Sequence, residues 1–331
     1  MIDLSIIIVN WNTKEHLARC LDSIFQNWPS HQTEIIVVDN GSTDGSADMV
    51  KNNYPEVKLI ANYQNLGFAR ANNIGINHSS GRFLCLLNSD TQVLDECFDR
   101  MINYMEIHPE IGILGPKILN PDLNVQRSCM AFPTLWNSLC RALALDSFVP
   151  RSKLFGGYLM TYFAHDSIRS VDIINGCCWL VRKEALDTVG LLDEQFFMYG
   201  EDMDWCRRFH QAGWQVVFYP EAQVVHYGGA SSAQLPVKFY IEMRRANLLY
   251  TKKHHGKIFY LLVLVTFWLH EIARIIGRVC QFLIMPSQKK EISFYIKRSR
   301  SALRYLLAQF SSSIHPSTGV NGESQLISIG D

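Results

Sequence analysis

The stretch EIIVVDNGSTDGS, residues 34–46, decides the fold class. Its apolar, β-branched core is typical of a short strand buried on both faces, and the polar residues after it predict a turn. The same order occurs earlier, where LSIIIV at 4–9 is followed by a helix-like pattern at 14–26. Further strand-like runs occupy 57–61, 82–87 and 111–118, and a helix-like pattern occupies 68–77. Apolar strands alternating with helices predict an α/β fold with a mainly parallel central sheet flanked by helices.

Length and composition narrow the class of protein. The 331 residues are enough for two domains, or for one large α/β domain with an appendage. Apolar residues make up 48% and charged residues 19%, which excludes a disordered chain. Lys+Arg and Asp+Glu are equal at 31 each, so the chain is not a uniformly basic nucleic-acid-binding protein. We therefore expect no nucleic-acid partner.

The charge is distributed unevenly. Residues 244–304 contain 13 Lys/Arg and two acidic residues, a net charge of +11, so the rest of the chain carries −11. Within this segment lies IFYLLVLVTFWL, residues 258–269, which is shorter than the roughly 20 residues that span a bilayer. The combination predicts an amphipathic helix lying on an anionic membrane surface, with a buried core or dimer helix as the alternative.

The nine cysteines and the N-terminus indicate the compartment. No C-x-x-C pair exists, which argues against zinc-ribbon and thioredoxin-type sites. Most cysteines stand in apolar runs, as buried, reduced thiols of cytosolic proteins do. The chain begins with a strand-like run, without a basic region or a cleavage site, so no signal peptide is expected.

Two strand ends carry acidic residues. Asp39 ends the strand of the opening stretch, and Asp90 follows the run RFLCLL in Asn88-Ser89-Asp90. Ligands bind beyond the carboxyl ends of strands in open parallel sheets. There Asp39 could accept a hydrogen bond from a pyrimidine ring N–H, and Asp90 could hold Mg²⁺ or Mn²⁺ with diphosphate oxygens. Either residue could instead stabilise a turn or cap a helix.

Two later segments offer acid–base and metal-binding groups. Glu201, Asp202 and Asp204 lie in the first turn of a predicted helix. Stabilisation of the helix dipole would explain them, but a carboxylate there could also take a proton from a substrate hydroxyl. His226 ends a strand before Gly-Gly and could bind a metal, or could be only half-exposed. The histidines at 254–255 have no evident partner and are expected at the surface.

Missing motifs exclude three enzyme classes. No strand is followed by G-x-G-x-x-G, and G-x-x-x-x-G-K-[ST] does not occur, which argues against NAD-linked dehydrogenases and P-loop NTPases. The absence of G-x-S-x-G argues against a serine hydrolase of the α/β class.

Taken together, the motifs resemble the family 2 glycosyltransferases with the GT-A fold, in particular their bacterial rhamnosyltransferase-like branch. The resemblance covers about residues 3–250 and depends on several motifs in the family's order and spacing. The matching segments are SIIIVNWN (5–12), EIIVVDNGSTDGS (34–46), NLGFARANNIGI (65–76), FLCLLNSDT (83–91), QRSCMAFPT (126–134), INGCCWLVRKEALDTVGLLDEQFFMYGEDMDWCRRFHQAGW (174–214) and VVHYGGAS (224–231).

The resemblance implies a role for each candidate residue. Asp39 would contact the pyrimidine, and Asp202, next to Glu201 in Gly-Glu-Asp, would be the general base. Asp90 and His226 would hold Mg²⁺ or Mn²⁺. The other residues that would bind the nucleotide-sugar are Asn10, Asn65, Arg70 and Asn88. Asn88 stands where the family's D-x-D motif has its first carboxylate, so this chain has one acidic ligand fewer.

The resemblance also implies an activity and an organisation. The protein would be an inverting, metal-dependent glycosyltransferase that uses a dTDP- or UDP-sugar, with dTDP-rhamnose favoured and UDP-hexose as the alternative. Its acceptor would be a glycan or a lipid-linked sugar in cell-surface polysaccharide synthesis, at the inner face of the cell membrane. Residues 1–118 would bind the nucleotide-sugar and 119–253 the acceptor; 254–310 would be a basic apolar helical extension and 311–331 a disordered tail.

Two other classes stay open from the residues alone. A sugar nucleotidyltransferase would carry a Gly-rich, basic loop after the first strand, where this chain has Asn10-Trp11-Asn12-Thr13. A non-catalytic protein that binds sugar nucleotides could keep Asp39 without a base, although Glu201 and Asp202 argue against it.

Overall fold

A computed structural model describes residues 2–143, 145–284 and 286–314. The strands are β1 (Leu4–Asn10), β2 (Thr33–Asp39), β3 (Lys58–Ala61), β4 (Phe83–Asn88), β5 (Thr91–Val93), β6 (Ile111–Leu119), β7 (Val125–Gln126), β8 (Cys129–Met130), β9 (Arg169–Ser170), β10 (Ile173–Ile174), β11 (Cys178–Arg182) and β12 (Gln215–His226). The α-helices are α1 (Lys14–Gln26), α2 (Ser46–Asn53), α3 (Phe68–Asn77), α4 (Cys97–Ile107), α5 (Leu135–Ala142), α6 (Leu145–Phe148), α7 (Leu186–Val189), α8 (Glu201–Gln211), α9 (Pro236–Ile284) and α10 (Lys289–Ile314).

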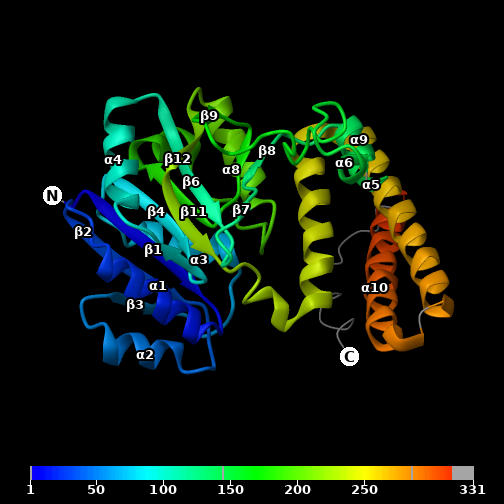
Figure 1. Ribbon diagram of the computed structural model, residues 1–331, viewed down its shortest axis with the longest axis horizontal. Helices are drawn as coiled ribbons and strands as arrows, with labels where there is room; N and C mark the ends of the chain where they lie inside the picture. Colours follow the sequence, from blue (N-terminus) through cyan, green and yellow to red (C-terminus); the bar gives the residue numbers. More distant parts are fainter. Residues whose placement is uncertain (1, 144, 285, 315–331) are drawn as a thin grey trace.

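One mixed sheet organises the protein, with the strand order β3-β2-β1-β4-β11-β6-β12-β5 (Figure 1). β1, β2, β3 and β4 are parallel to one another, and β6 and β12 form a second parallel pair. β11 joins the two groups by pairing antiparallel with both β4 and β6. The expected α/β fold with a mainly parallel central sheet is therefore confirmed, and one sheet contains strands from both sides of residue 118.

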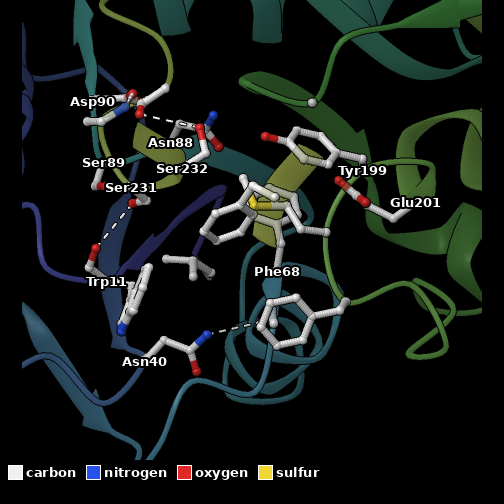
Figure 2. A pocket seen from close by; sticks show the side chains of 18 of the residues that line it. Trp11, Asn40, Phe68, Asn88, Ser89, Asp90, Tyr199, Glu201, Ser231 and Ser232 are labelled. Carbon is white, nitrogen blue, oxygen red and sulfur yellow. Dashed lines mark hydrogen bonds between the residues drawn. The ribbon is translucent and has the colours of Figure 1, made fainter. Parts of the chain in front are cut away.

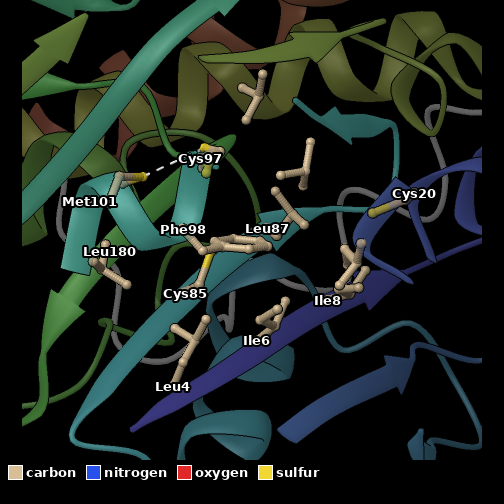
Figure 3. Close-up of a cluster of buried hydrophobic side chains, with 14 of the residues drawn as sticks. Leu4, Ile6, Ile8, Cys20, Cys85, Leu87, Cys97, Phe98, Met101 and Leu180 are labelled. Atoms are coloured by element: carbon tan, nitrogen blue, oxygen red, sulfur yellow. Dashed lines mark hydrogen bonds between the residues drawn. The ribbon is translucent and has the colours of Figure 1, made fainter. Parts of the chain in front are cut away.

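Apolar side chains cover both faces of the sheet. Along β1, Leu4, Ile6 and Ile8 pack with α1 and α4, whereas Ile7 points into a second cluster with Trp179 and other residues of the opposite face. Figure 3 shows the first cluster, in which Phe98 and Met101 of α4 lie over β1 and β4. This two-sided burial explains why the strand sequences are apolar throughout instead of alternating with polar residues.

The cysteines contribute to this interior. All nine lie in the described part of the chain and are free, and eight are buried. Cys280, in α9, is exposed. The expectation that most of the cysteines are buried is thus confirmed.

The C-terminal region forms a helical hairpin (Figure 1). α9 extends for 49 residues and changes direction at Gly256, whose φ of 77° is not helical, and α10 packs along its second arm. Glu271 anchors that arm, because its buried carboxylate accepts hydrogen bonds from Arg244 (2.8 Å) and Tyr240 (2.5 Å) on the first arm.

Two features of this region bear on the sequence expectations. α9 continues well beyond the apolar run 258–269, so an 18-residue window has mean hydropathy 1.7 and α9 could cross a membrane by length and composition alone. The disordered tail expected at 311–331 does not begin at residue 311, because α10 continues to Ile314. Residues 315–331 lie outside the described part of the chain.

Candidate functional site

A cavity of about 230 Å³ opens where the parallel strands end (Figure 2). Asn88 and Asp90 lie on one wall, with His226 of β12 nearby. Glu201, beside Asp202 at the start of α8, lies across the cavity from them. Side chains that the chain separates by more than 100 residues, those of Asn88, Asp90, Asp202 and His226, are thus brought to one cavity.

Asp90 and His226 form the polar centre of the first wall. The Asp90 Oδ1 atom is 3.2 Å from His226 Nε2, and Asp90 Oδ2 accepts a hydrogen bond of 3.3 Å from the amide of Ala230. Burial opposes ionisation of Asp90, but the hydrogen bond and charge of His226 outweigh it and lower the pKa of this carboxyl group. Asp90 is therefore an anion at neutral pH despite being buried.

Gln126 fixes the orientation of His226. Its Oε1 atom is 2.6 Å from His226 Nδ1, while its Nε2 donates to Asn120 Oδ1 at 2.8 Å. Because the amide nitrogen is used on Asn120, Oε1 accepts a hydrogen bond from His226 Nδ1–H, and His226 Nε2 points toward Asp90. The sequence analysis did not identify Gln126, although it opens the motif QRSCMAFPT.

These residues fit a divalent cation. An imidazole nitrogen and a carboxylate oxygen 3.2 Å apart need a proton or a cation between them, and a metal ion could replace the proton. Asn88 could offer a third ligand atom, because its Oδ1 is buried and has no hydrogen-bond partner among the described residues. Nitrogen and oxygen atoms of this kind suit Mn²⁺, and the oxygens suit Mg²⁺.

Glu201 and Asp202 begin α8 on the opposite wall. Tyr199 and Gly200 have φ values of 66° and 80°, and this left-handed turn directs the helix start toward the cavity. Burial raises the pKa of Asp202 to about 6, although the amide of Met203 donates to its Oδ1 at 2.8 Å. Burial, followed by the charge of Asp202, raises the pKa of Glu201 well above its usual range.

The two carboxyl groups therefore differ at neutral pH. The raised pKa of Glu201 favours its protonated form, and its Oε2 is buried without a partner among the described residues. Asp202 is mainly ionised, so it can accept a proton. Of the pair, Asp202 is the one suited to act as a general base.

The third carboxylate of this helix has a structural role. Asp204 is fully buried and lies 2.8 Å from Arg208 Nε, 2.7 Å from Lys253 Nζ and 2.7 Å from His254 Nε2. Burial opposes its ionisation, but these partners lower the pKa of Asp204 to about 2. Asp204 thus ties α8 to α9, and the expectation that His254 lies at the surface is wrong.

Asp39 and Asn10 are buried together beside the cavity. Asp39 accepts hydrogen bonds of 3.0 Å from Asn10 Nδ2 and from the amide of Ser42, while Asn10 Oδ1 accepts one of 2.7 Å from Thr13. Asp39 and Asn10 do not line the cavity, whereas Asn40, which follows Asp39, lines it. The turn expected after the strand is present, and the contact of Asp39 with a pyrimidine stays a prediction.

The other two candidate residues differ in position. Asn65 lines the cavity, and its Oδ1 accepts hydrogen bonds of 2.9 Å from Asn40 Nδ2 and from the amide of Gly67. Gly67 allows a close approach, since a Cβ atom there would lie 2.5 Å from the carbonyl oxygen of Phe197. Arg70 does not line the cavity, and its half-exposed guanidinium is 3.7 Å from Glu194.

Aromatic side chains form much of the remaining wall. Trp11, Phe68 and Tyr199 are directed into the cavity in Figure 2, and Phe197 and Phe239 also line it. Flat apolar surfaces beside acidic and amide groups suit a nucleoside and a sugar ring. The sequence analysis singled out none of these aromatic residues, although Trp11 follows the first strand, Phe68 begins a predicted helix and Tyr199 directly precedes another.

Comparison with known proteins identifies the family. The model for "Glycosyl transferase family 2" matches residues 5–190. The chain is 30% identical over 264 residues to the N-acetylglucosaminyl-diphospho-decaprenol L-rhamnosyltransferase of Mycobacterium tuberculosis, covering 76% of this chain and 85% of that protein. It is 25% identical over 313 residues to the dTDP-rhamnosyl transferase RfbF of Shigella flexneri, covering 90% of this chain and 93% of that protein.

Two solved structures cover most of this chain at low sequence identity. Staphylococcus aureus TarS matches with a TM-score of 0.49 and 13% identity, covering 94% of this chain and 92% of that one. The Pyrobaculum calidifontis mannosyltransferase PcManGT, in complex with GDP-Man and Mn²⁺, matches with a TM-score of 0.47 and 13% identity, covering 95% and 87%. The family match and the sheet topology together show that this chain belongs to glycosyl transferase family 2, with a fold of the GT-A type and rhamnosyltransferases among its relatives.

Proposed function

We propose that this protein transfers L-rhamnose from dTDP-rhamnose, with inversion at the anomeric carbon, to a hydroxyl group of a lipid-linked sugar or glycan in cell-surface polysaccharide synthesis. The names of the Mycobacterium tuberculosis and Shigella flexneri relatives support the sugar, and the second of them supports dTDP as the nucleotide. The observation that carries the proposal is that Asp90 with His226 and Asp202 with Glu201 lie on two walls of one cavity.

The first wall would hold the diphosphate of the donor. Asp90, His226 and the unpartnered oxygen of Asn88 are the residues that would bind Mg²⁺ or Mn²⁺. When bound, the ion would stabilise the negative charge of the departing nucleoside diphosphate. Gln126 would keep His226 Nε2 directed toward Asp90. Asp39 and Asn10, buried just behind Asn40, are proposed to meet the pyrimidine, and Asn65 and Arg70 to lie near the sugar nucleotide.

The second wall would activate the acceptor. Asp202 is mainly ionised at neutral pH and can remove the proton from the attacking hydroxyl group. Glu201, which keeps its proton, can donate a hydrogen bond to the acceptor or the transferred sugar. Attack from the wall opposite the leaving group gives inversion in a single displacement. This arrangement supports an enzyme over a protein that only binds sugar nucleotides.

Donor identity can be tested by product release. With a lipid-linked sugar acceptor and Mn²⁺, dTDP-rhamnose should give dTDP at a higher rate than UDP-hexoses give UDP, and it should raise the melting temperature most, since ligand binding stabilises the folded state by mass action. A preference for a UDP-hexose would show that the transferred sugar is a hexose and not rhamnose. This is the second candidate, because the chain is 27% identical over 211 residues to the hexosyltransferase Agl10 of Haloferax volcanii. Release of pyrophosphate would reject glycosyl transfer.

The C-terminal hairpin is proposed to hold the protein on the membrane. Along the second arm of α9, exposed apolar side chains repeat every three or four residues and so share one face of the helix. They are Ile258, Leu262, Val265, Leu269, Ile276, Val279 and Leu283. The other side of this arm packs on α10 and on the first arm, which favours a helix that lies in the interface over one that crosses the bilayer. The basic residues of the segment would contact anionic lipids at the cytoplasmic face.

Substitution of the exposed face tests this attachment. The triple variant Leu262→Gln, Leu269→Gln, Leu283→Gln should bind vesicles containing anionic lipid roughly 100-fold or more weakly in flotation, because burial of each leucine contributes about 1.5–3 kcal/mol. Ile107→Gln, at an exposed apolar residue of α4, should float like the unchanged protein. Equal flotation of the triple variant would reject the hairpin as the membrane-binding element.

A further inference from the structure

A second cavity, of about 360 Å³, lies between the α5–α6 segment and the two arms of α9. Three arginine side chains line it: Arg141 of α5, Arg244 of the first arm and Arg274 of the second. Among the described residues that line it, Asp146 is the one carboxylate, 3.8 Å from Arg141. The cavity therefore carries an excess of positive charge.

Arg244 is ion-paired with Glu271, but one of its hydrogen-bond donors has no acceptor among the described residues. Its guanidinium donates hydrogen bonds to Glu271 (2.8 Å) and to the Tyr240 hydroxyl (2.9 Å), but its Nε is buried and has no partner among the described residues. Two more cations, Arg274 and Arg298, lie over the ring of Tyr240. Their guanidinium carbons are 5.8 and 4.2 Å from the centroid of this ring. A buried cation without a full set of acceptors is costly, so an anion is expected to complete this cluster.

The second cavity is close to the proposed base. Tyr158 lines it and stacks under Arg141, whose guanidinium carbon is 5.5 Å from the ring centroid. The Tyr158 hydroxyl also donates to the sulfur of Met203 at 3.6 Å, and Met203 directly follows Asp202. Tyr158 thus contacts both the arginine cluster and the residue that follows the proposed base.

Exposed apolar side chains stand next to the residues that line the cavity. They are Leu139 of α5, Leu143 just after it, Phe148 of α6 and Leu269 of α9, and none of them lines the cavity itself. Phe148 is 80% exposed and Leu269 is 55% exposed. A cationic cavity formed by elements that also expose apolar side chains suits an amphiphile with an anionic head and a hydrocarbon chain.

We propose that this second cavity binds the diphosphate of a polyprenyl-diphosphate-linked sugar acceptor. The inference rests on the proposed function, because the sugar next to the diphosphate would present its hydroxyl group to Asp202. Arg141, Arg244 and Arg274 would pair with the phosphate oxygens through charge-assisted hydrogen bonds, for which the planar guanidinium is well suited. The first isoprene units would lie on the exposed apolar side chains of α5, α6 and α9.

Farnesyl diphosphate, a short-chain diphosphate probe, tests the site in the full-length chain in neutral detergent. Saturating dTDP and Mn²⁺ keep the probe out of the nucleotide site. Arg141→Gln and Arg274→Gln should each weaken its binding by roughly 10-fold or more, the loss expected for one hydrogen bond to a charged group. Arg300→Gln, at an exposed residue of α10, removes the same charge and should bind the probe normally. Farnesol should bind weakly and equally to all four proteins.

Three outcomes would overturn the assignment. The probe could bind both cavity variants as tightly as the unchanged protein, or dTDP could displace it completely. Alternatively, binding to phosphatidylglycerol vesicles could fall as much in the two variants as binding of the probe, which would assign the cavity to a phospholipid headgroup.

Transfer assays separate this inference from the proposed function. In Arg141→Gln and Arg274→Gln the KM for a lipid-linked acceptor should rise while the KM for the donor stays unchanged. If transfer occurs and the acceptor KM does not rise, the cavity assignment alone is rejected. If the probe binds as expected but no nucleotide-sugar supports transfer, the anion site stands and the proposed function is rejected.

Discussion

Asp202→Asn should lower kcat by about 10²–10⁴-fold, the usual contribution of a general base. The amide cannot take the proton of the attacking hydroxyl group, whereas its size and its hydrogen bond from the Met203 amide can be kept. Donor binding, measured as the rise in melting temperature on adding dTDP and Mn²⁺, should therefore be unchanged. The rate of nucleoside diphosphate release under saturating substrates gives the effect on kcat.

Two neighbours serve as controls for this substitution. Glu201→Gln should have a much smaller effect, because the raised pKa of Glu201 favours its protonated form and the amide retains a hydrogen-bond donor. Asp204→Asn should instead lower thermal stability, since it removes the charge that pairs with Arg208, Lys253 and His254. Near-normal transfer by Asp202→Asn, or a larger loss in Glu201→Gln, would remove Asp202 from the role of base.

The pH dependence of the unchanged enzyme gives a second readout of the same group. Burial raises the pKa of Asp202 to about 6, and only the ionised carboxylate can accept a proton. The rate should be constant above that pKa and fall about tenfold per pH unit below it, as the base becomes protonated. Asp202→Asn should lack this acidic limb.

Asp90→Ala should lower the affinity for dTDP in the presence of Mn²⁺ by at least roughly 100-fold. Removing a residue that only orients a metal ligand already weakens metal binding up to about 100-fold, and removing a metal ligand itself should weaken it at least as much. Asp90 is the one carboxylate beside His226 Nε2, and its lowered pKa keeps it ionised for a cation. Isothermal titration with dTDP, with and without Mn²⁺, should show that the metal no longer strengthens binding. The apparent affinity without metal should change little.

The matched control for this variant is Asp95→Ala, which removes an exposed carboxylate just after β5. It should bind dTDP and Mn²⁺ like the unchanged protein. Asp90→Ala with an intact metal dependence would contradict the assignment of Asp90 and His226. Equal effects of the two substitutions would show that the result depends on overall charge.

The local pattern of apolar and polar residues was enough to predict many of the helices and strands in the first half of the chain. The helix-like patterns at 14–26 and 68–77 coincide with α1 and α3, and the apolar runs before Asp39 and Asn88 coincide with β2 and β4 to within one residue. Burial on both faces leaves strands apolar throughout, and that pattern can be read without knowledge of the neighbouring strands. The C-terminal region was predicted less well, because the break in α9 at Gly256 and its extension to Ile284 depend on packing between two arms and α10.

The family and the acidic residues at the strand and helix ends were determined by the sequence alone, since motifs and their spacing are properties of the chain. The tertiary structure decided what each carboxylate does. Asp202 and Asp204 are two residues apart on one helix, yet burial raises the pKa of the first to about 6 and three cationic partners lower that of the second to about 2. Those partners include residues nearly 50 positions away, and only the packing of α9 against α8 brings them within a hydrogen bond of Asp204.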